Sequence, residues 1–104
     1  MGTLYYGAAR TAVKIDDRVL SHLKLLIVSK LRRNEPFLLS WAEGADNGHG
    51  RSSVWIHESL DIVFRFDGGR QPELEKELLD RLSNEALAPA GVRIEASMPR
   101  FSSR

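Results

Sequence analysis

Apolar and polar residues alternate along residues 54–66, and this pattern constrains the fold more than any other feature of the chain. Every even position there except Glu58 is apolar, while the odd positions are mostly polar. Period-2 alternation is typical of a β-sheet with one buried face. It predicts that one set of side chains faces the core: Val54, Ile56, Ile62, Phe64 and Phe66. A second set should face the other way: Trp55, His57, Asp61, Val63 and Arg65.

Strand-forming residues recur along the chain between turn signals. We expect strands at residues 3–6, 12–15, 37–41, 53–57, 60–66 and 92–96, the first two as a hairpin and the last at a sheet edge. A polar loop should fill residues 43–52. A three-residue loop at 58–60, or a single bent strand, keeps the apolar side chains of 54–66 on one face.

The segment 17–33 has the pattern of an amphipathic helix. Asp16 or Asp17 can cap its first turn, and the arginines at its end complement the helix dipole. Its sheet-facing stripe should be Val19, Leu20, Leu23, Leu26, Ile27 and Leu31. Leu25 and Val28 fall outside that stripe, and we expect His22 to be solvated.

A second helix is predicted at residues 72–87, because Pro72 costs no hydrogen bond in a first turn. Its buried stripe should be Leu74, Leu78, Leu79, Leu82 and Ala86. Residues 1–96 should therefore form one α+β domain, a mainly antiparallel sheet of about five strands packed on the helix at 17–33. Residues 97–104 should form a flexible tail.

Composition narrows the classes of function. The chain has 104 residues, no cysteine and a net charge of +1, so it is one domain without disulfides or thiolate chemistry. No apolar run is long enough to cross a membrane and no leader opens the chain, so we expect a cytoplasmic location. His22, His49 and His57 lack the spacing of a metal site, so we expect neither a metal nor a cofactor. His57 beside Glu58 reads as a surface histidine, because neighbours in a strand point to opposite faces.

Basic and hydroxyl side chains suggest an anion or nucleic-acid site. The candidates are Arg18, Arg32, Arg33, Arg51, Ser52 and Ser53. The first three share a helix face that could follow a phosphate backbone, and the last three close a glycine-rich loop whose amides and hydroxyls suit a phosphate. The same loop also fits a mobile hairpin connection without a site.

Three apolar residues point to a different role. Leu25, Val28 and Trp55 lie outside the expected core stripes, and exposed apolar side chains mark interaction surfaces. Contacts with another chain, including a second copy of this one, are therefore a rival to nucleic-acid binding.

Several sequence blocks carry a resemblance to known proteins. They are MGTLYYG at 1–7, IDDR at 15–18, KLRRNE at 30–35, SW at 40–41, GRSSVWIH at 50–57, FRF at 64–66 and PEL at 72–74. Together they resemble a family of small actinobacterial proteins that commonly carry the label ATP-dependent DNA ligase. The resemblance covers about nine-tenths of the chain and implies a connection with DNA.

A ligase of that class joins AMP to a lysine in a Lys-x-Asp-Gly-x-Arg motif. The nearest match is Lys14 to Arg18, in which Asp17 replaces the glycine and Arg18 falls one position early. The added carboxylate repels a nucleotide phosphate, and the chain is too short for an adenylation fold. We therefore expect a non-catalytic accessory or binding module with DNA as its partner. The alternative is a homo-oligomeric protein-interaction module without a nucleic-acid role.

Overall fold

A computed structural model describes residues 1–42 and 50–96, and this part of the chain has the predicted α+β class. The elements in chain order are β1 (Gly2–Tyr6), β2 (Thr11–Ile15), α1 (Asp17–Arg32), β3 (Phe37–Ala42), β4 (Arg51–Ile56), β5 (Ile62–Arg65), α2 (Lys76–Ala86) and β6 (Val92–Glu95). The predicted tail at 97–104 and most of the predicted loop, 43–49, lie outside the described residues.

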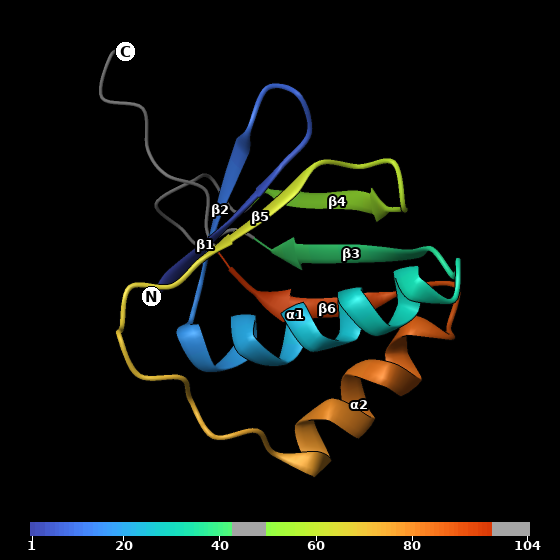
Figure 1. Ribbon diagram of the computed structural model, residues 1–104. Coiled ribbons are helices and arrows are strands. Elements are labelled where there is room, and N and C mark those ends of the chain that lie inside the picture. The colour runs from blue at the N-terminus through green and yellow to red at the C-terminus, as the bar shows by residue number, and fades with distance from the viewer. Residues whose placement is uncertain (43–49, 97–104) are drawn as a thin grey trace.

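The strands form two sheets instead of the single sheet that the sequence suggested. One has the order β2-β1-β5 and the other β4-β3-β6. All pairs are antiparallel except β3 with β6, which is parallel. The predicted hairpin of β1 and β2 is confirmed, and β6 is the expected edge strand (Figure 1).

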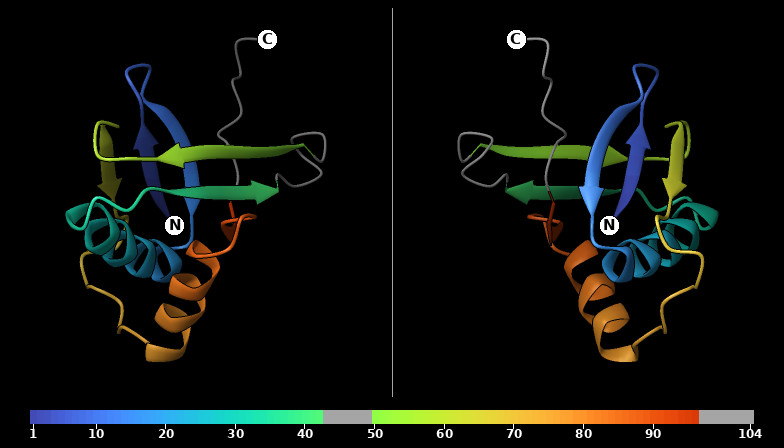
Figure 2. Two further views of the ribbon diagram at one scale, coloured as in Figure 1. Left: turned by 90° about the vertical axis from the view of Figure 1, so that its right-hand side faces the viewer. Right: turned by 90° about the vertical axis from the view of Figure 1, so that its left-hand side faces the viewer.

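The two sheets cross over a shared core, and the helices lie along one side of them. In Figure 2 the strands β3 and β4 run across the direction of β1 and β2. Helix α1 packs beside β1, and α2 packs against α1 and against β6 and β3. Tyr6 of β1 meets Trp41 of β3 edge to face, with ring centroids 6.4 Å apart. This contact joins the sheets within a core of fully or nearly fully buried residues that includes Leu4, Leu23 and Leu39.

The predicted alternation from 54 to 66 is confirmed within each strand, but the predicted connection is wrong. Ile56 is buried and Phe64 half-buried, while Trp55 and Val63 are exposed. However, β4 pairs with β3 and β5 pairs with β1, so they form neither a hairpin nor one bent strand. A turn closed by the Leu60 amide on the His57 carbonyl, at 3.1 Å, carries the chain from one sheet to the other. Alternation determines which face is buried, not which strand is the neighbour.

Helix α1 matches its prediction closely. Asp16 caps it, since its carboxylate accepts a hydrogen bond from the Arg18 amide at 3.1 Å. The predicted stripe is buried or half-buried, whereas Leu25 and Val28 are exposed by 40% and 36%. Those two side chains therefore face away from the core, as expected.

Helix α2 starts four residues later than predicted. Residues 71–75 are not helical, and Glu75 has extended backbone angles. Leu74 therefore precedes the helix and is 43% exposed, so its predicted burial is wrong, whereas Leu82 is fully buried. The prediction for His22 is also wrong, because its ring is completely buried. The two errors share a cause: His22 and Arg18 bind Glu75 and hold it in extended form.

Candidate nucleic-acid interface

Side chains at alternate positions of the β4-β3-β6 sheet point away from the core. On the inward side, Leu39, Trp41, Ile56 and Val92 are buried. The residues at the alternating positions between them point the other way, and we call this side the outer face: Leu38, Ser40, Ala42, Arg51, Ser53, Trp55, Arg93 and Glu95. Each of these residues is half-buried or exposed.

Strand register places the outer-face residues in rows across the sheet. Ser40 on β3 lies between Ser53 on β4 and Arg93 on β6. In the next row Ala42 lies between Arg51 and Glu95. The two arginines therefore occupy opposite edge strands, on a diagonal across the middle strand.

A broad open hollow of about 770 Å³ covers this part of the sheet. It is lined by Ser40, Trp41, Ala42, Gly50, Arg51, Ser52, Ser53, Ala90, Arg93 and Ile94. The hydroxyls of Ser40 and Ser53 lie 2.7 Å apart and form a hydrogen bond. Hydroxyls beside guanidinium groups are a donor set that suits phosphate oxygens.

Both arginines of the hollow are available to a ligand. Arg51 and Arg93 are exposed, and neither side chain forms an ion pair within residues 1–42 and 50–96. Glu95 is the acidic residue of the outer face, so two positive charges stand against one negative charge. The outer face thus has a net charge of +1, which equals the net charge of the whole chain.

Trp55 adds an aromatic surface to the same face. It lies two positions beyond Ser53 on β4, opposite Leu38, and 54% of it is exposed. A large ring that stands on an open sheet can stack on a nucleobase, whose flat face is similar for all bases. Arginines, hydroxyls and an exposed aromatic ring therefore meet on one surface.

Arg51 and Ser52, predicted in the loop, lie in a strand instead, and Ser53 lies in a strand as predicted. Arg51, Ser52 and Ser53 begin β4, and Arg51 and Ser53 are on the outer face. Ser52 is on the inward side of the sheet, because it pairs with the inward-facing Trp41. Of the glycines in the predicted phosphate loop, Gly44 and Gly48 lie outside the described residues, whereas Gly50 lines the hollow.

The three candidates on α1 and at its C-cap do not join this surface, since none of them lines the hollow. Arg18 binds both carboxylate oxygens of Glu75, at 2.6 and 2.7 Å. This hydrogen bond lowers the pKa of Glu75 and raises that of Arg18. Arg33 contacts Glu35 at 3.2 Å. The pKa of Glu35 is lowered mainly by its hydrogen bond with Lys30, and also by its hydrogen bond with Arg33. Of the three predicted arginines, Arg32 alone has no ion pair in the described part of the chain.

The predicted partner contacts lie on more than one surface. Leu25 lines a groove of about 390 Å³ between α1 and α2, together with Leu79 and Leu87, and Leu87 is 76% exposed. Val28 does not line this groove, and Trp55 belongs to the outer face. All three are exposed, as predicted, but they do not form a single patch.

Sequence reasoning missed Ser40 and Arg93. Alternation along 37–41 puts Ser40 opposite in direction to Leu39, and alternation along 92–96 does the same for Arg93. Alternation gives only the direction in which each side chain points. Ser40 and Arg93 become neighbours through the parallel pairing of β3 with β6, and the sequences of these two short strands do not indicate that pairing.

Asp16 and Asp17, which lie in the segment that resembles a ligase motif, have structural roles here. Lys14 lies on β2 opposite Thr3 and lines neither the hollow nor the groove. Asp16 caps α1, and the Asp17 carboxylate accepts hydrogen bonds from the amides of Asp67 and Gly68, at 3.5 and 3.0 Å.

The fold and this surface define a small α+β domain with an arginine-flanked outer sheet face. The chain belongs to the family described as a domain of unknown function, DUF7882, whose profile matches residues 1–97. Comparisons with curated proteins and with solved structures found no match. Within the described residues, no helix has the length and apolar character needed to span a membrane.

Proposed function

We propose that the protein is a non-catalytic module that binds single-stranded nucleic acid, with DNA as its partner, through the outer face of the β4-β3-β6 sheet. One observation carries the proposal. Arg51 and Arg93, both without ion pairs in the described part, flank a hydroxyl pair on the face that also exposes Trp55. Single-strand binders combine cations that follow the backbone with aromatic rings that stack on bases.

The geometry suits an extended strand better than an isolated phosphate. β4 and β6 are separated by two strand spacings, about 10 Å, with β3 between them. Guanidinium groups on the two edges can therefore contact different phosphates of one chain. Trp55 lies further along β4 than Arg51, so a base can stack there while the backbone crosses the arginines.

The contacts on the outer face imply weak, salt-sensitive binding. Each phosphate contact on a single strand contributes about −0.7 to the slope of log K against log salt concentration, so two arginines give a slope of about −1.4. Stacking on one aromatic ring contributes about 1–3 kcal/mol. Most of the specificity for single strands should therefore come from Trp55.

Fluorescence anisotropy with a labelled oligothymidylate at low salt tests the proposal. Arg51→Glu combined with Arg93→Glu should abolish binding. Arg32→Glu combined with Arg81→Glu makes the same change in net charge on the helices and should retain most of it. Absence of any complex with the unaltered protein, or equal losses in both double variants, would reject the outer face as the binding surface.

Self-association is the second candidate, favoured by the exposure of Leu25 and Leu87 beside one groove. The proposed occupant is a second copy of this chain, because the helices would bury each other's exposed leucines. Sedimentation velocity should then show a dimer that Leu25→Glu converts to a monomer. A monomer at high concentration in the unaltered protein would remove this candidate.

A further inference from the structure

The β2-β1-β5 sheet has a solvent-facing side of its own, which the proposed function does not use. Leu4, Val13 and Phe64 lie opposite one another across this sheet and face the core. The alternate positions point away from the core and form what we call the second face: Thr3, Tyr5, Ala12, Lys14, Val63 and Arg65. None of these residues lines the hollow on the outer face, so the two faces are separate surfaces.

Strand register places two cations of the second face in one row. Thr3 of β1 lies between Lys14 of β2 and Arg65 of β5. Arg65 is exposed and Lys14 half-buried, whereas Thr3 is almost fully buried. The two outer strands of this sheet are separated by two strand spacings, about 10 Å. The row therefore offers a partner two separate positive charges.

Arg10 adds a third cation from the turn between β1 and β2. Its guanidinium lies over the Tyr5 ring, 5.1 Å from the ring centroid. Its φ of +53° is in the left-handed region, which is unfavourable for an arginine and easily adopted by glycine. Strained backbone positions of this kind cluster at functional sites. The strained arginine therefore points to a use for its charge.

The three cations are available to a partner. Arg10, Lys14 and Arg65 form no ion pair within residues 1–42 and 50–96. Asp61 precedes β5 in the same alternation and contributes one negative charge. Three positive charges thus stand against one negative charge, a larger excess than on the outer face. Charge complementarity favours a polyanion on this surface.

The aromatic ring of the second face is not open for stacking, unlike Trp55 on the outer face. Tyr5 is half-buried, and the Arg10 guanidinium lies over its ring. Cations without an open ring contact phosphates, which position a nucleic acid, and do not stack on its bases. Double-stranded DNA presents a dense line of phosphates, with one charge per about 1.7 Å of axis.

We propose that the second face binds the phosphate backbone of double-stranded DNA through Arg10, Lys14 and Arg65, independently of base sequence. This inference does not rest on single-strand binding at the outer face, because different residues carry it. Three phosphate contacts on a duplex give a slope of log K against log salt concentration of about −2.7. Binding should therefore be strong only at low salt.

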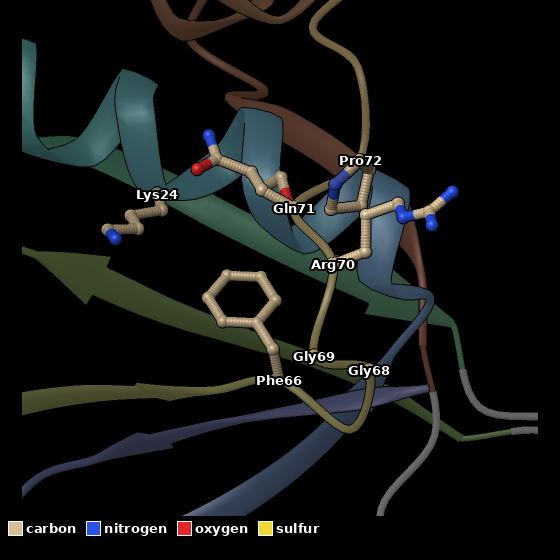
Figure 3. A pocket seen from close by; sticks show the side chains of 8 residues that line it. Lys24, Phe66, Gly68, Gly69, Arg70, Gln71 and Pro72 are labelled. Atoms are coloured by element: carbon tan, nitrogen blue, oxygen red, sulfur yellow. The ribbon is translucent and has the colours of Figure 1, made fainter.

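Fluorescence anisotropy with a short labelled duplex at low salt tests the proposal. Combining Arg10→Gln, Lys14→Gln and Arg65→Gln should weaken duplex binding at least about tenfold. The matched control combines Lys24→Gln, Arg32→Gln and Arg70→Gln, which makes the same change in net charge. It should retain most of the affinity, because Lys24 and Arg70 lie beside Phe66 in a different depression (Figure 3).

Arg10→Asn separates recognition from folding. Asparagine tolerates the left-handed backbone of this turn, so the melting temperature should stay the same or rise. The charge is lost, so the magnitude of the salt slope should fall by about 0.9. A lower melting temperature with an unchanged salt slope would show that Arg10 only shapes the turn and would overturn its role in binding.

Crossed measurements separate this proposal from the proposed function. The triple glutamine variant should still bind oligothymidylate, and Arg51→Glu with Arg93→Glu should still bind duplex. No duplex binding at low salt, or equal losses in the triple variant and its control, would overturn the proposal. Tighter binding of inorganic polyphosphate than of duplex at equal phosphate concentration would also reject DNA as the partner of this face.

Discussion

The Nε2 atom of His22 accepts a hydrogen bond from the backbone amide of Glu75 at 2.7 Å. Its Nδ1 atom lies 2.6 Å from the carbonyl oxygen of Arg18. A carbonyl only accepts and an amide only donates, so the ring carries its proton on Nδ1 and offers a lone pair at Nε2. In this one tautomer, His22 joins α1 to the segment that becomes α2.

Replacing His22 by phenylalanine should destabilise the protein while keeping a ring in the core. The Glu75 amide would lose its acceptor, and an unsatisfied group of this kind costs about 1–3 kcal/mol. Urea unfolding of the variant should show that decrease in the free energy of unfolding. His57→Phe is the matched control, since His57 is only half-buried and water can replace its bond with the Ser59 amide. Equal losses in the two variants would mean that the His22 bond is not important for stability.

Acid should weaken the protein partly through Glu75. The hydrogen bond from Arg18 lowers the folded-state pKa of Glu75 below the value of about 4.3 expected in the unfolded chain. A carboxyl group whose pKa is lowered by folding stabilises the protein at pH values above its unfolded-state pKa. This stabilisation is lost as the pH falls through its folded-state pKa. The loss of stability below about pH 4.3 should therefore be smaller in Glu75→Gln than in the unaltered protein. Glu73→Gln, which removes an exposed carboxylate without an ion pair in the described part, should keep the full acid dependence; unfolding curves at several pH values compare the three.

Local patterns in the sequence determine a large part of this fold. The alternation along 54–66, the stripe of α1 and its Asp16 cap depend on neighbours in sequence, and the structure confirms each of them. Strand partners were not predictable in the same way, because β5 pairs with β1 from the far end of the chain. The start of α2 was missed for the same reason, since residues more than fifty positions earlier hold Glu75.

The candidate surface was predictable only in part. Arg51 and Ser53 were identified because they close the glycine-rich loop, and Trp55 was identified as an exposed apolar residue for partner contacts. Arg93 was missed because it reaches them only through the pairing of β3 with β6. Arg18 illustrates the opposite error: a basic residue on a helix appeared free for phosphate, but a carboxylate 57 residues away neutralises it.

Gly91 is required at the entrance to β6 for two separate reasons. Its φ of +75° is unfavourable for other residues, and a Cβ there would clash with the carbonyl oxygen of Leu38. Gly7 has a similar φ of +79°, but a Cβ there would meet nothing within 4 Å. Gly7→Ala should therefore cost only the conformational term, about 1–2 kcal/mol. Gly91→Ala should cost about 1–3 kcal/mol more, because it also overpacks the contact with β3; denaturant unfolding of both variants measures the difference.

The two tryptophans should respond very differently to a quencher in solution. Trp55 is 54% exposed on the outer face, whereas Trp41 is 2% exposed and packs against Tyr6. Acrylamide should therefore quench most of the Trp55 emission and little of the Trp41 emission. Trp55→Phe should remove the accessible component, and Trp41→Phe should leave it nearly intact. If oligothymidylate stacks on Trp55, it should quench the same component and protect it from acrylamide. Loss of the accessible component in Trp41→Phe instead would show that the inward and outward faces of this sheet are reversed.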